Sequence, residues 1–435
     1  MKIEGRYMFA KKKTSDVFGV SNIILPDSYV DRGSLDQHIQ LLLGRRTHIA
    51  LRGESKCGKS WLRQKNIPSA ITIQCRLKKK IIDLYVDALS QLEIKLIVDE
   101  SSSSSFKASV EARGEVGAAI LAKLGFKSSV STDTNSGSRT TTPGHDINDL
   151  RYIADIIKES ERRLVIEDFH YMSVEERASF AFDLKALWDY GVFVIIIGVW
   201  SQNNMLIHLN PDLSGRIEEV SIYWSDPDLD QVITKGASAL ELNFSGPLKK
   251  RAIGECFGNA GILQKLVLDT LDQLGIKEKQ SSITEVSALD ALESAELAYA
   301  EQLNPLYQQF ASRVSKGIRN RQDSTGIYAH AIAVILETDD QALMKGITRD
   351  QIYEIAHSRQ NRIQKGNLGK VLEKFEELQV DSEGRGLVLS YNEATAEIAV
   401  VDRQLLLYRK YATVKWPWEE MIKEADASGN GFSGD

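Results

Sequence analysis

Apolar and polar residues alternate in blocks along the first half of the chain, as they do in proteins built from alternating strands and helices. Four short apolar runs, each bounded by polar or glycine-containing segments, predict buried strands. These runs lie at residues 47–55, 70–75, 162–172 and 192–200. Helical spacing of apolar residues predicts helices at residues 34–43, 58–64, 80–92, 147–160 and 174–191. Continuous apolar strands between such helices are typical of an α/β fold, a parallel sheet with helices on both faces.

The second half of the chain has a helical pattern. From about residue 226 the predicted strands stop, and residues 226–282 predict a small helical unit. Residues 283–310 are rich in Ala, Glu and Leu and predict a linking helix. The chain up to residue 415 then predicts three helices, a two-stranded hairpin and a closing helix, which is the element order of a winged-helix domain.

One stretch of the first half, residues 101–145, departs from this pattern. It contains five consecutive serines and a long segment rich in Ser, Thr and Gly. Such a composition is typical of a flexible insertion with little packed structure of its own, and we favour that interpretation over a functional segment. We further expect residues 1–27 to form an arm and residues 416–435 a tail.

The composition restricts the setting more than the function. At 435 residues the chain is too long for one ordinary core, and its net charge of -6 gives no overall attraction to nucleic acid or acidic membranes. Its three cysteines have the spacing of neither a metal site nor a disulfide framework, which suits a reducing compartment. The longest apolar run, residues 192–200, is far shorter than the roughly 20 residues that cross a bilayer. We therefore expect a cytoplasmic protein without a membrane partner.

The strongest chemical signal is the spacing G-x-x-x-x-G-K-S, where the first predicted strand meets a helix. Glycines let backbone N–H groups turn onto a phosphate, and the start of the helix adds a favourable dipole. Lys59 would reach the β- and γ-phosphates, and the Ser60 hydroxyl would hold Mg²⁺. This context disfavours a glycine-rich turn without a ligand. The residues expected to bind the nucleotide are Gly53, Glu54, Ser55, Lys56, Cys57, Gly58, Lys59, Ser60 and Trp61.

A pair of acids would complete the metal site. Glu167 and Asp168 end an apolar run that would lie beside the strand before the loop. One carboxylate would orient the water shell of Mg²⁺ while its neighbour takes a proton from the attacking water. Taken alone, such a pair could equally be a helix cap or a solvated pair. Together with the loop it predicts a hydrolytic site.

Several segments, taken in order, resemble the AAA+ and STAND groups of P-loop ATPases. They are YVDRGSLDQHIQLLL (29–43), GESKCGKS (53–60), LVIEDFHYM (164–172), VFVIIIGVWSQ (192–202), DLSGRIEEVSI (212–222) and GNAGILQKL (258–266). The resemblance implies ATP and Mg²⁺ as ligands, a sensor of the γ-phosphate at Ser201, and an arginine, Arg216, that acts on the nucleotide of a neighbouring subunit. An ordinary surface salt bridge is an equally good interpretation of Arg216.

The chain departs from these families in two ways. Its acids stand in the order Glu then Asp, whereas AAA+ proteins have Asp then Glu, so either Glu167 or Asp168 could be the base. Residues 258–264 also lack the arginine that often serves as a second sensor, which favours a STAND-like switch over a processive motor. His170 could couple the site to the lid, but a histidine with satisfied hydrogen bonds near the sheet edge is the favoured interpretation.

The predicted winged-helix domain does not by itself identify the molecule that it binds. Such domains bind DNA when a basic third helix enters the major groove and a basic wing touches the backbone. The third helix and the segment before it carry basic residues at Arg359, Arg362, Lys365, Lys370 and Lys374. The helix also carries three glutamates, and the wing tip at 392–397 has two glutamates and no basic residue. That charge would meet phosphates badly, so docking on protein is favoured over duplex DNA.

The sequence as a whole predicts an ATP-binding, Mg²⁺-dependent P-loop NTPase. Residues 28–225 would bind the nucleotide, residues 226–282 would form a helical lid, and residues 283–415 would form the linking helix and the winged-helix domain. We expect a slow, regulated ATPase that acts as a switch on a partner protein or on its own oligomer; the resemblance makes a role in bacterial defence one hypothesis. The alternatives are an AAA+ loader or transposition-type regulator that assembles on duplex DNA with ATP, and a scaffold with negligible turnover.

Overall fold

A parallel sheet forms the centre of the first half of the chain. The computed structural model describes residues 11–99, 107–125, 150–200, 202–317, 325–380 and 386–429. The sheet has five strands in the order β2-β5-β6-β1-β7, and every neighbouring pair is parallel. The strands are β1 (His48–Gly53), β2 (Ile71–Gln74), β5 (Leu164–Glu167), β6 (Val194–Gly198) and β7 (Ile217–Ile222).

The four strands predicted from apolar runs are confirmed, and the reason is burial on both faces. Along β1, Ile49 belongs to the core on one side of the sheet and Ala50 to the core on the other side. The fifth strand, β7, was not predicted as a strand. It lies at an edge of the sheet, where Glu218 and Ser221 are exposed and Glu219 is partly buried, so it lacks a continuous apolar run.

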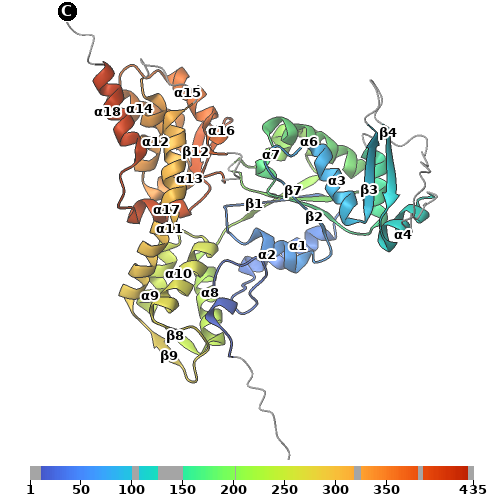
Figure 1. Cartoon of the computed structure of the whole chain (residues 1–435), viewed down its shortest axis with the longest axis horizontal. Coiled ribbons are helices and arrows are strands. Elements are labelled where there is room, and N and C mark those ends of the chain that lie inside the picture. The colour runs from blue at the N-terminus through green and yellow to red at the C-terminus, as the bar shows by residue number, and fades with distance from the viewer. Residues whose placement is uncertain are drawn as a thin grey trace, which may run out of the picture.

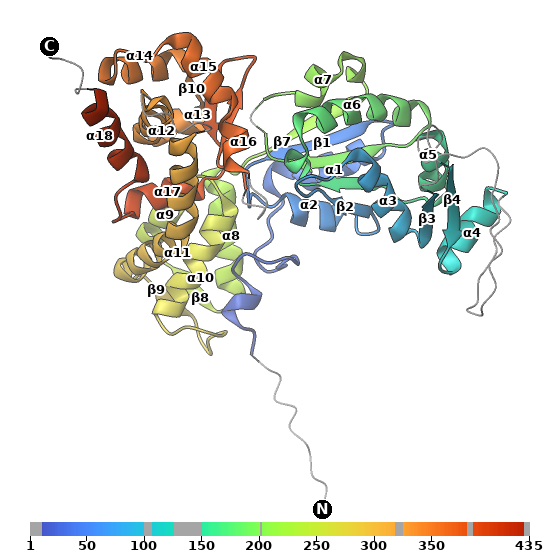
Figure 2. The ribbon, with the colours of Figure 1, turned by 45° about the horizontal axis from the view of Figure 1, so that its top comes forward.

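Helices cover both faces of this sheet, as predicted (Figure 2). The helices α1 (Leu35–Leu43) and α2 (Lys59–Asn66) pack on one face through residues such as Ile39 and Leu62. The other face is covered by α3 (Ile81–Gln91), α5 (Leu150–Glu159), α6 (Val174–Asp189) and the short α7 (Met205–Leu209). Short 3-10 helices lie at Arg32–Ser34, Phe169–Tyr171 and Pro211–Leu213.

The prediction of an insertion without packed structure is wrong for residues 107–125. The strands β3 (Ile94–Asp99) and β4 (Lys107–Ala112) form an antiparallel pair, and α4 (Glu115–Lys123) follows. Ile120 and Leu121 of this helix are buried in the core that α3 and α5 share. These apolar residues are few, and the serine-rich sequence around them hid their pattern. The rest of 101–145 lies outside the described residues.

The helical unit after the sheet is confirmed, with two short strands added. Its helices are α8 (Asp226–Ala239), α9 (Gly246–Glu255) and α10 (Ala260–Gln273), and β8 (Leu242–Phe244) pairs in parallel with β9 (Thr284–Val286). Three-residue strands are too short for a sequence pattern to predict. The described part of the arm, with a 3-10 helix at Thr14–Asp16, packs on this lid, where Val17 and Phe18 are fully buried.

The C-terminal third contains the predicted helices, hairpin and closing helix after one long helix, α11 (Leu289–Lys316), with elements added. Among the described residues, five helices precede the hairpin where three were predicted, because the short α13 was not predicted and the expected third helix is divided into α15 and α16. The hairpin joins a short strand in an antiparallel sheet of order β10-β12-β11. The elements are α12 (Ile327–Glu337), α13 (Asp340–Lys345), β10 (Ile347–Thr348), α14 (Arg349–Arg359), α15 (Lys365–Glu373), α16 (Phe375–Gln379), β11 (Leu389–Asn392), β12 (Glu397–Val400), α17 (Gln404–Tyr411) and α18 (Pro417–Gly429). The expected tail therefore contains a helix, α18, whose Trp418 is buried in the core.

The buried apolar residues divide the molecule into two bodies (Figure 1). The sheet domain (residues 35–222) has one core on each face of its sheet. The arm–lid–C-terminal body (residues 11–30 and 226–429) has a single core that runs from Phe18 to Trp418. Among the described residues, no helix is both long and apolar enough to span a bilayer.

Candidate nucleotide site

The glycine-rich loop lies at the carboxyl end of β1, where the chain turns into α2. Gly58 has a φ of 90°, a conformation that residues with a side chain rarely adopt. A Cβ at Gly53 would stand 2.7 Å from Cys57 Sγ and 3.1 Å from the carbonyl oxygen of Ile222, so this position accepts only glycine. Both glycines of the motif are therefore required by the shape of the loop.

Lys59 supplies a cation at the centre of this loop. Its side chain is buried, and its Nζ donates to the carbonyl oxygens of Gly53 at 3.0 Å and of Glu54 at 2.5 Å. Because Lys59 is the first residue of α2, the ammonium group lies close to the backbone N–H groups that begin the helix. A cation and a helix N-terminus at one point form a site suited to phosphate.

A cavity of about 320 Å³ opens over the loop, and four parts of the chain line it. The other body contributes about half of the wall, and Arg32 and Trp224 of the connecting segments line it too. The sheet domain contributes Ser55, Lys56, Gly58, Lys59, Ser60, Trp61, Asp168, His170, Tyr171 and Val199. The arm supplies Gly19, Val20, Ser21, Ser28, Tyr29 and Val30; the lid supplies Ala260, Gly261 and Gln264; the C-terminal domain supplies Gly386, Leu387 and Asp402. A ligand in this cavity would touch both bodies at once.

The two acids do not share the cavity. Asp168 lines it and accepts a hydrogen bond from Gln74 Nε2 at 3.0 Å. Glu167 points elsewhere and forms an ion pair with Arg63 of α2, with 3.0 Å between Nε and Oε1. Asp168 follows the last residue of β5 and has a left-handed backbone conformation with a φ of 57°, so the strict alternation of a strand does not apply to the pair. Their hydrogen-bond partners show that the two side chains point to different places. The sequence analysis did not identify Gln74. The feature that could have identified it is its position at the end of β2, where it pairs with Glu167 of β5.

Of the other two predicted catalytic residues, Arg216 is not brought to this cavity. Ser201 lies outside the described residues. Arg216 precedes β7 at the edge of the sheet where β1 begins, as the pairing of His48 with Ile217 shows, whereas the loop follows the other end of β1. Its guanidinium lies 5.0 Å from the ring centre of Trp188 and donates to the carbonyl oxygen of Asp212. An action of Arg216 on a nucleotide in its own chain is thereby excluded, and action on a neighbouring subunit stays a prediction.

Comparisons with known proteins find similarity only among solved structures. No family model and no curated protein matches the chain. The Orc1 protein of Aeropyrum pernix, in complex with DNA, aligns over 91% of this chain and 95% of its own, with 8% identity and a TM-score of 0.39. Cdc6p of Pyrobaculum aerophilum covers 94% of this chain and 98% of its own, with 12% identity and a TM-score of 0.32.

A STAND protein of Pyrococcus horikoshii with a tetratricopeptide repeat sensor aligns over 96% of this chain at 11% identity and a TM-score of 0.37. The chain spans about half the length of that protein, since 47% of it is covered. At these TM-scores and identities the similarity carries no weight for activity, substrate or partner. The proposed activity, substrate and partner therefore rest on the residues of the site.

The strand order decides the fold. One strand, β6, separates the loop-bearing β1 from the acid-bearing β5, and a helical lid follows the sheet. The chain has an α/β fold of the P-loop NTPase type, with the glycine-rich loop between β1 and α2. In this fold the loop and Asp168 lie at the carboxyl edge of the parallel strands, where α/β proteins bind their ligands.

The cavity also contains an arginine that the motif analysis did not single out. Arg32 is 8% exposed, and its guanidinium lies over the ring of Trp224, 4.1 Å from the ring centre. Burial lowers the pKa of Arg32, and its Nε and Nη2 have no hydrogen-bond partner among the described residues. Buried donors without a partner are costly, so these atoms suit an anionic or carbonyl group of a ligand. The one sequence feature that could have identified Arg32 is its position in segment 29–43.

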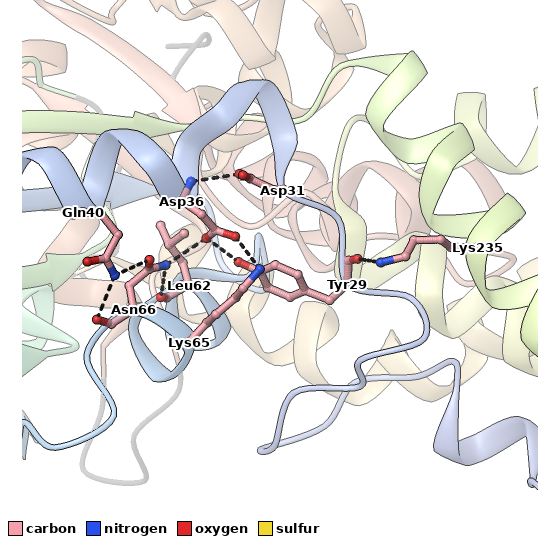
Figure 3. A network of polar contacts seen from close by, with 8 residues as sticks. All are labelled: Tyr29, Asp31, Asp36, Gln40, Leu62, Lys65, Asn66 and Lys235. Atoms are coloured by element: carbon pink, nitrogen blue, oxygen red, sulfur yellow. Dashed lines mark hydrogen bonds and ion pairs between the residues drawn. The ribbon is translucent and has the colours of Figure 1, made fainter.

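A polar network fixes the wall of the cavity next to Arg32 (Figure 3). Tyr29, which lines the cavity, donates from its hydroxyl to Asp36 Oδ1 at 2.7 Å, and Lys65 and Asn66 of α2 donate to the same carboxylate at 2.6 and 2.8 Å. Burial raises the pKa of Asp36, but these hydrogen bonds outweigh it and hold that pKa below its usual value. Lys235 of the lid donates to the Tyr29 carbonyl at 2.5 Å, so the network reaches both bodies.

The lid and the C-terminal domain both bind the backbone of the phosphate loop. Asn259, the N-cap of α10, donates from Nδ2 to the Ser55 carbonyl at 2.8 Å, and the N–H of Gly261 donates to the Lys56 carbonyl at 3.2 Å. From the C-terminal domain, the Val401 carbonyl accepts the N–H of Ser55 at 3.2 Å. Every change of loop conformation therefore alters contacts in both of these parts.

Charged side chains of the loop face the C-terminal domain as well. Glu54 forms an ion pair with Arg403, and Lys56 Nζ donates to Gln404 Oε1. Burial raises the pKa of Glu54 to about 7, although Arg403 and Lys59 oppose this shift. The sequence analysis assigned these loop residues to the nucleotide alone, because residues about 350 positions away cannot be paired with them from one sequence.

His170 lies in the cavity wall, where its Nδ1 accepts the N–H of Val199 at 3.3 Å. Burial, together with the charges of Lys59 and Arg177, lowers its pKa to about 3. The imidazole is thus neutral at physiological pH and accepts a hydrogen bond, which agrees with the favoured interpretation of a satisfied histidine. It has no proton to supply for acid–base chemistry at that pH.

Proposed function

We propose that this protein is an ATP-binding, Mg²⁺-dependent ATPase that works as a nucleotide-controlled switch. In this proposal the occupant of the phosphate loop sets the position of the lid and the C-terminal domain, and these act on a partner protein or on a second copy of the chain. The observation that carries the proposal is the direct bonding of the loop backbone to both parts, through Asn259 and Val401. A nucleotide that reshapes the loop has to strengthen or break these bonds.

The residues of the cavity fit a nucleotide with Mg²⁺. Lys59 and the start of α2 would bind the β- and γ-phosphates, while Arg32 would offer its unpartnered donors to the nucleotide. The Ser60 hydroxyl and the Asp168 carboxylate both line the cavity, and Mg²⁺ prefers such hard oxygen ligands. The metal, when bound, would neutralise charge on the phosphates. Asp168 would orient its water shell.

The arrangement of the acids supports slow and regulated turnover. Arg63 holds Glu167 away from the cavity, so Asp168 is the acid of the pair that is left to act there. If Asp168 orients the metal, general-base help for the attacking water is weak until Glu167 leaves Arg63. A role for Arg216 in completing the site of a neighbouring subunit remains part of this proposal.

Replacing Lys59 by alanine tests the nucleotide site. We expect Lys59→Ala to weaken ATP binding by about 10- to 100-fold, because a hydrogen bond to a charged group contributes about 1.5–3 kcal/mol. Calorimetry or a fluorescent ATP analogue measures the affinity. Lys185→Ala, which removes an exposed lysine paired with Asp189 on α6, is the matched control. Equal affinities of Lys59→Ala and the wild type would refute the site.

The alternative of a DNA-binding loader draws little support from the C-terminal domain. Three of the basic side chains that would face DNA already have acidic partners: Lys365 with Asp350 at 2.8 Å, Lys374 with Glu377 at 3.1 Å, and Arg359 with Glu337 at 2.6 Å. Phosphates would have to compete with these carboxylates. We therefore propose that the output of the switch is docking on a protein. A role in bacterial defence rests on the sequence resemblance alone.

A further inference from the structure

The arm, the lid and the C-terminal domain share one apolar core. Buried side chains connect Phe18 of the arm with Leu263 of the lid and Leu406 of α17 in a single cluster. The sheet domain has its own two cores, on the two faces of its sheet. Packed cores resist partial separation because each gap loses close contacts and exposes apolar surface to water. The lid is therefore joined to the C-terminal domain more firmly than either is to the sheet.

The helix α11 is the element that these parts have in common. It has 28 residues and packs on α10 of the lid and on α12, α17 and α18 of the C-terminal domain. In its first half Glu296 is 0% exposed and accepts hydrogen bonds from Arg251 of α9 and from the hydroxyl of Tyr411 of α17, both at 2.7 Å. Pulling the lid away from the C-terminal domain would take one of these two partners from the buried carboxylate, which is unfavourable.

The contact between the sheet domain and the other body is of a different kind. It consists mainly of polar contacts: those around the phosphate loop, the hydrogen bonds of α1 and α2 with the arm, and the ion pair of Arg177 with Glu376 at 3.9 Å. The hydrogen bonds to the arm join Asp36 with Tyr29, Trp61 with Ser21 and Gln64 with Asn22. Its apolar part is a small separate cluster in which Val199 of the sheet domain meets Leu387 and Val401. Polar contacts of this sort exchange with water at small net cost, so this interface is the weaker one.

The chain crosses between the two bodies at two neighbouring points. One is the segment before α1, which contains Arg32, and the other is residues 223–225, between β7 and α8. The stacking of Arg32 on Trp224 joins these two crossings, and both residues line the nucleotide cavity. In the second crossing Tyr223 is exposed, whereas Trp224 packs against the core of each body and so forms the fixed point between them. The cavity thus lies at the hinge.

We infer that the arm, the lid, α11 and the C-terminal domain move as one rigid body, and that the sheet domain turns against this body about the Arg32–Trp224 crossing. Only the trigger, filling of the cavity by nucleotide, rests on the proposed function. The C-terminal domain does not leave the lid when the molecule opens. What opens is the interface of the phosphate loop, α6 and β6 with residues 376–404.

Distances between spin labels at three exposed positions test this inference. Phe182→Cys marks the sheet domain, Ile283→Cys the lid and Ile355→Cys the C-terminal domain; all three side chains are exposed, and the native cysteines are buried. Pairs of these variants in the full chain give three distances by pulsed electron resonance. Each pair is measured without nucleotide, with ADP, and with a non-hydrolysable ATP analogue.

Two further variants open the interface without nucleotide. Glu376→Lys places a second cation against Arg177, and Leu387→Glu puts a charge into the small apolar cluster. Both residues lie outside the shared core of the body, so the fold should survive, and circular dichroism checks this for each variant. Whichever change opens the molecule, we expect both distances from position 182 to lengthen or broaden while the 283–355 distance stays the same.

Other outcomes overturn the inference. A change in the 283–355 distance would mean that the lid and the C-terminal domain separate. A change in 182–355 with 182–283 constant would mean that the C-terminal domain moves alone. Constant distances under every condition would mean that the two bodies form one rigid unit. Failure of the proposed function is distinguishable, because a protein that does not bind ATP would still respond to Glu376→Lys and Leu387→Glu.

Discussion

Two of the four variable positions of the phosphate loop carry charged side chains, and the C-terminal domain binds both. Glu54 meets Arg403, and Lys56 meets Gln404. A loop that only held phosphate would have no need of these residues, since its backbone and Lys59 do that work. At the scale of single residues, the switch is thus built into positions that the G-x-x-x-x-G-K-S pattern leaves unspecified.

The two acids of the site should differ in their effects. Because Asp168 lines the cavity and Glu167 is held by Arg63, we expect Asp168→Asn to lower kcat by about 10- to 100-fold, the usual effect of losing a group that orients the ligands of a metal. Glu167→Gln keeps a polar group beside Arg63 and should lower kcat less. Steady-state ATPase assays at saturating ATP decide between them. The opposite ranking would assign the reaction to Glu167.

Glu54 should make the stability of the protein depend on pH. Burial raises its pKa from 4.5 to about 7, so between these values the folded protein holds a proton that the unfolded chain has lost. The free energy of unfolding should therefore fall as pH rises from about 4.5 to 7, by up to roughly 3 kcal/mol, and stay level above that range. Glu54→Gln removes this dependence. Denaturant unfolding of both proteins at several pH values measures it, and identical pH profiles would contradict the account.

At the scale of elements, the sequence predicted those strands and site residues that have a pattern in a short stretch of the chain. The strands β1, β2, β5 and β6 are continuous apolar runs, and Lys59, Ser60 and Asp168 lie in the cavity as their motifs predict. Edge strand β7 and helix α4 escaped because half-exposed or short elements have weak patterns. Arg32, Gln74 and the segment 401–404 escaped for another reason. Their importance comes from contacts between residues far apart in the chain, which a single sequence does not display.

The start of α17 should control how fast nucleotide leaves. Arg403 joins this element to Glu54 of the loop and to the Phe257 carbonyl of the lid. Arg403→Ala removes both bonds and should speed dissociation of a fluorescent ADP analogue by about 10-fold, the effect of losing one charge-assisted hydrogen bond. Arg409→Ala, on the same helix, is the control, because its partner Asp340 lies within the C-terminal domain. Equal rates for the two variants would argue against a hold on the loop.

At the scale of the whole molecule, the nucleotide cavity is the place where two bodies meet. The sheet domain brings the phosphate loop and the segments at residues 168–171 and at Val199, the arm, lid and C-terminal domain bring the opposite side, and Arg32 and Trp224 lie between them in sequence. The interface is polar around the loop and has only a small apolar cluster at Val199, Leu387 and Val401. A bound nucleotide replaces or rearranges those polar contacts, and so it can change the relation of the bodies without unfolding either core.

Hydrogen exchange of backbone amides, compared between the ADP-bound protein and the protein with a non-hydrolysable ATP analogue, tests this account most directly. The account predicts that the γ-phosphate changes protection of the Ser55 and Gly261 amides, which bond across the interface, and of the neighbouring residues 386–404 in the C-terminal domain. Lys59→Ala should abolish the difference. A change in protection confined to the sheet domain would contradict a switch that reaches the C-terminal domain.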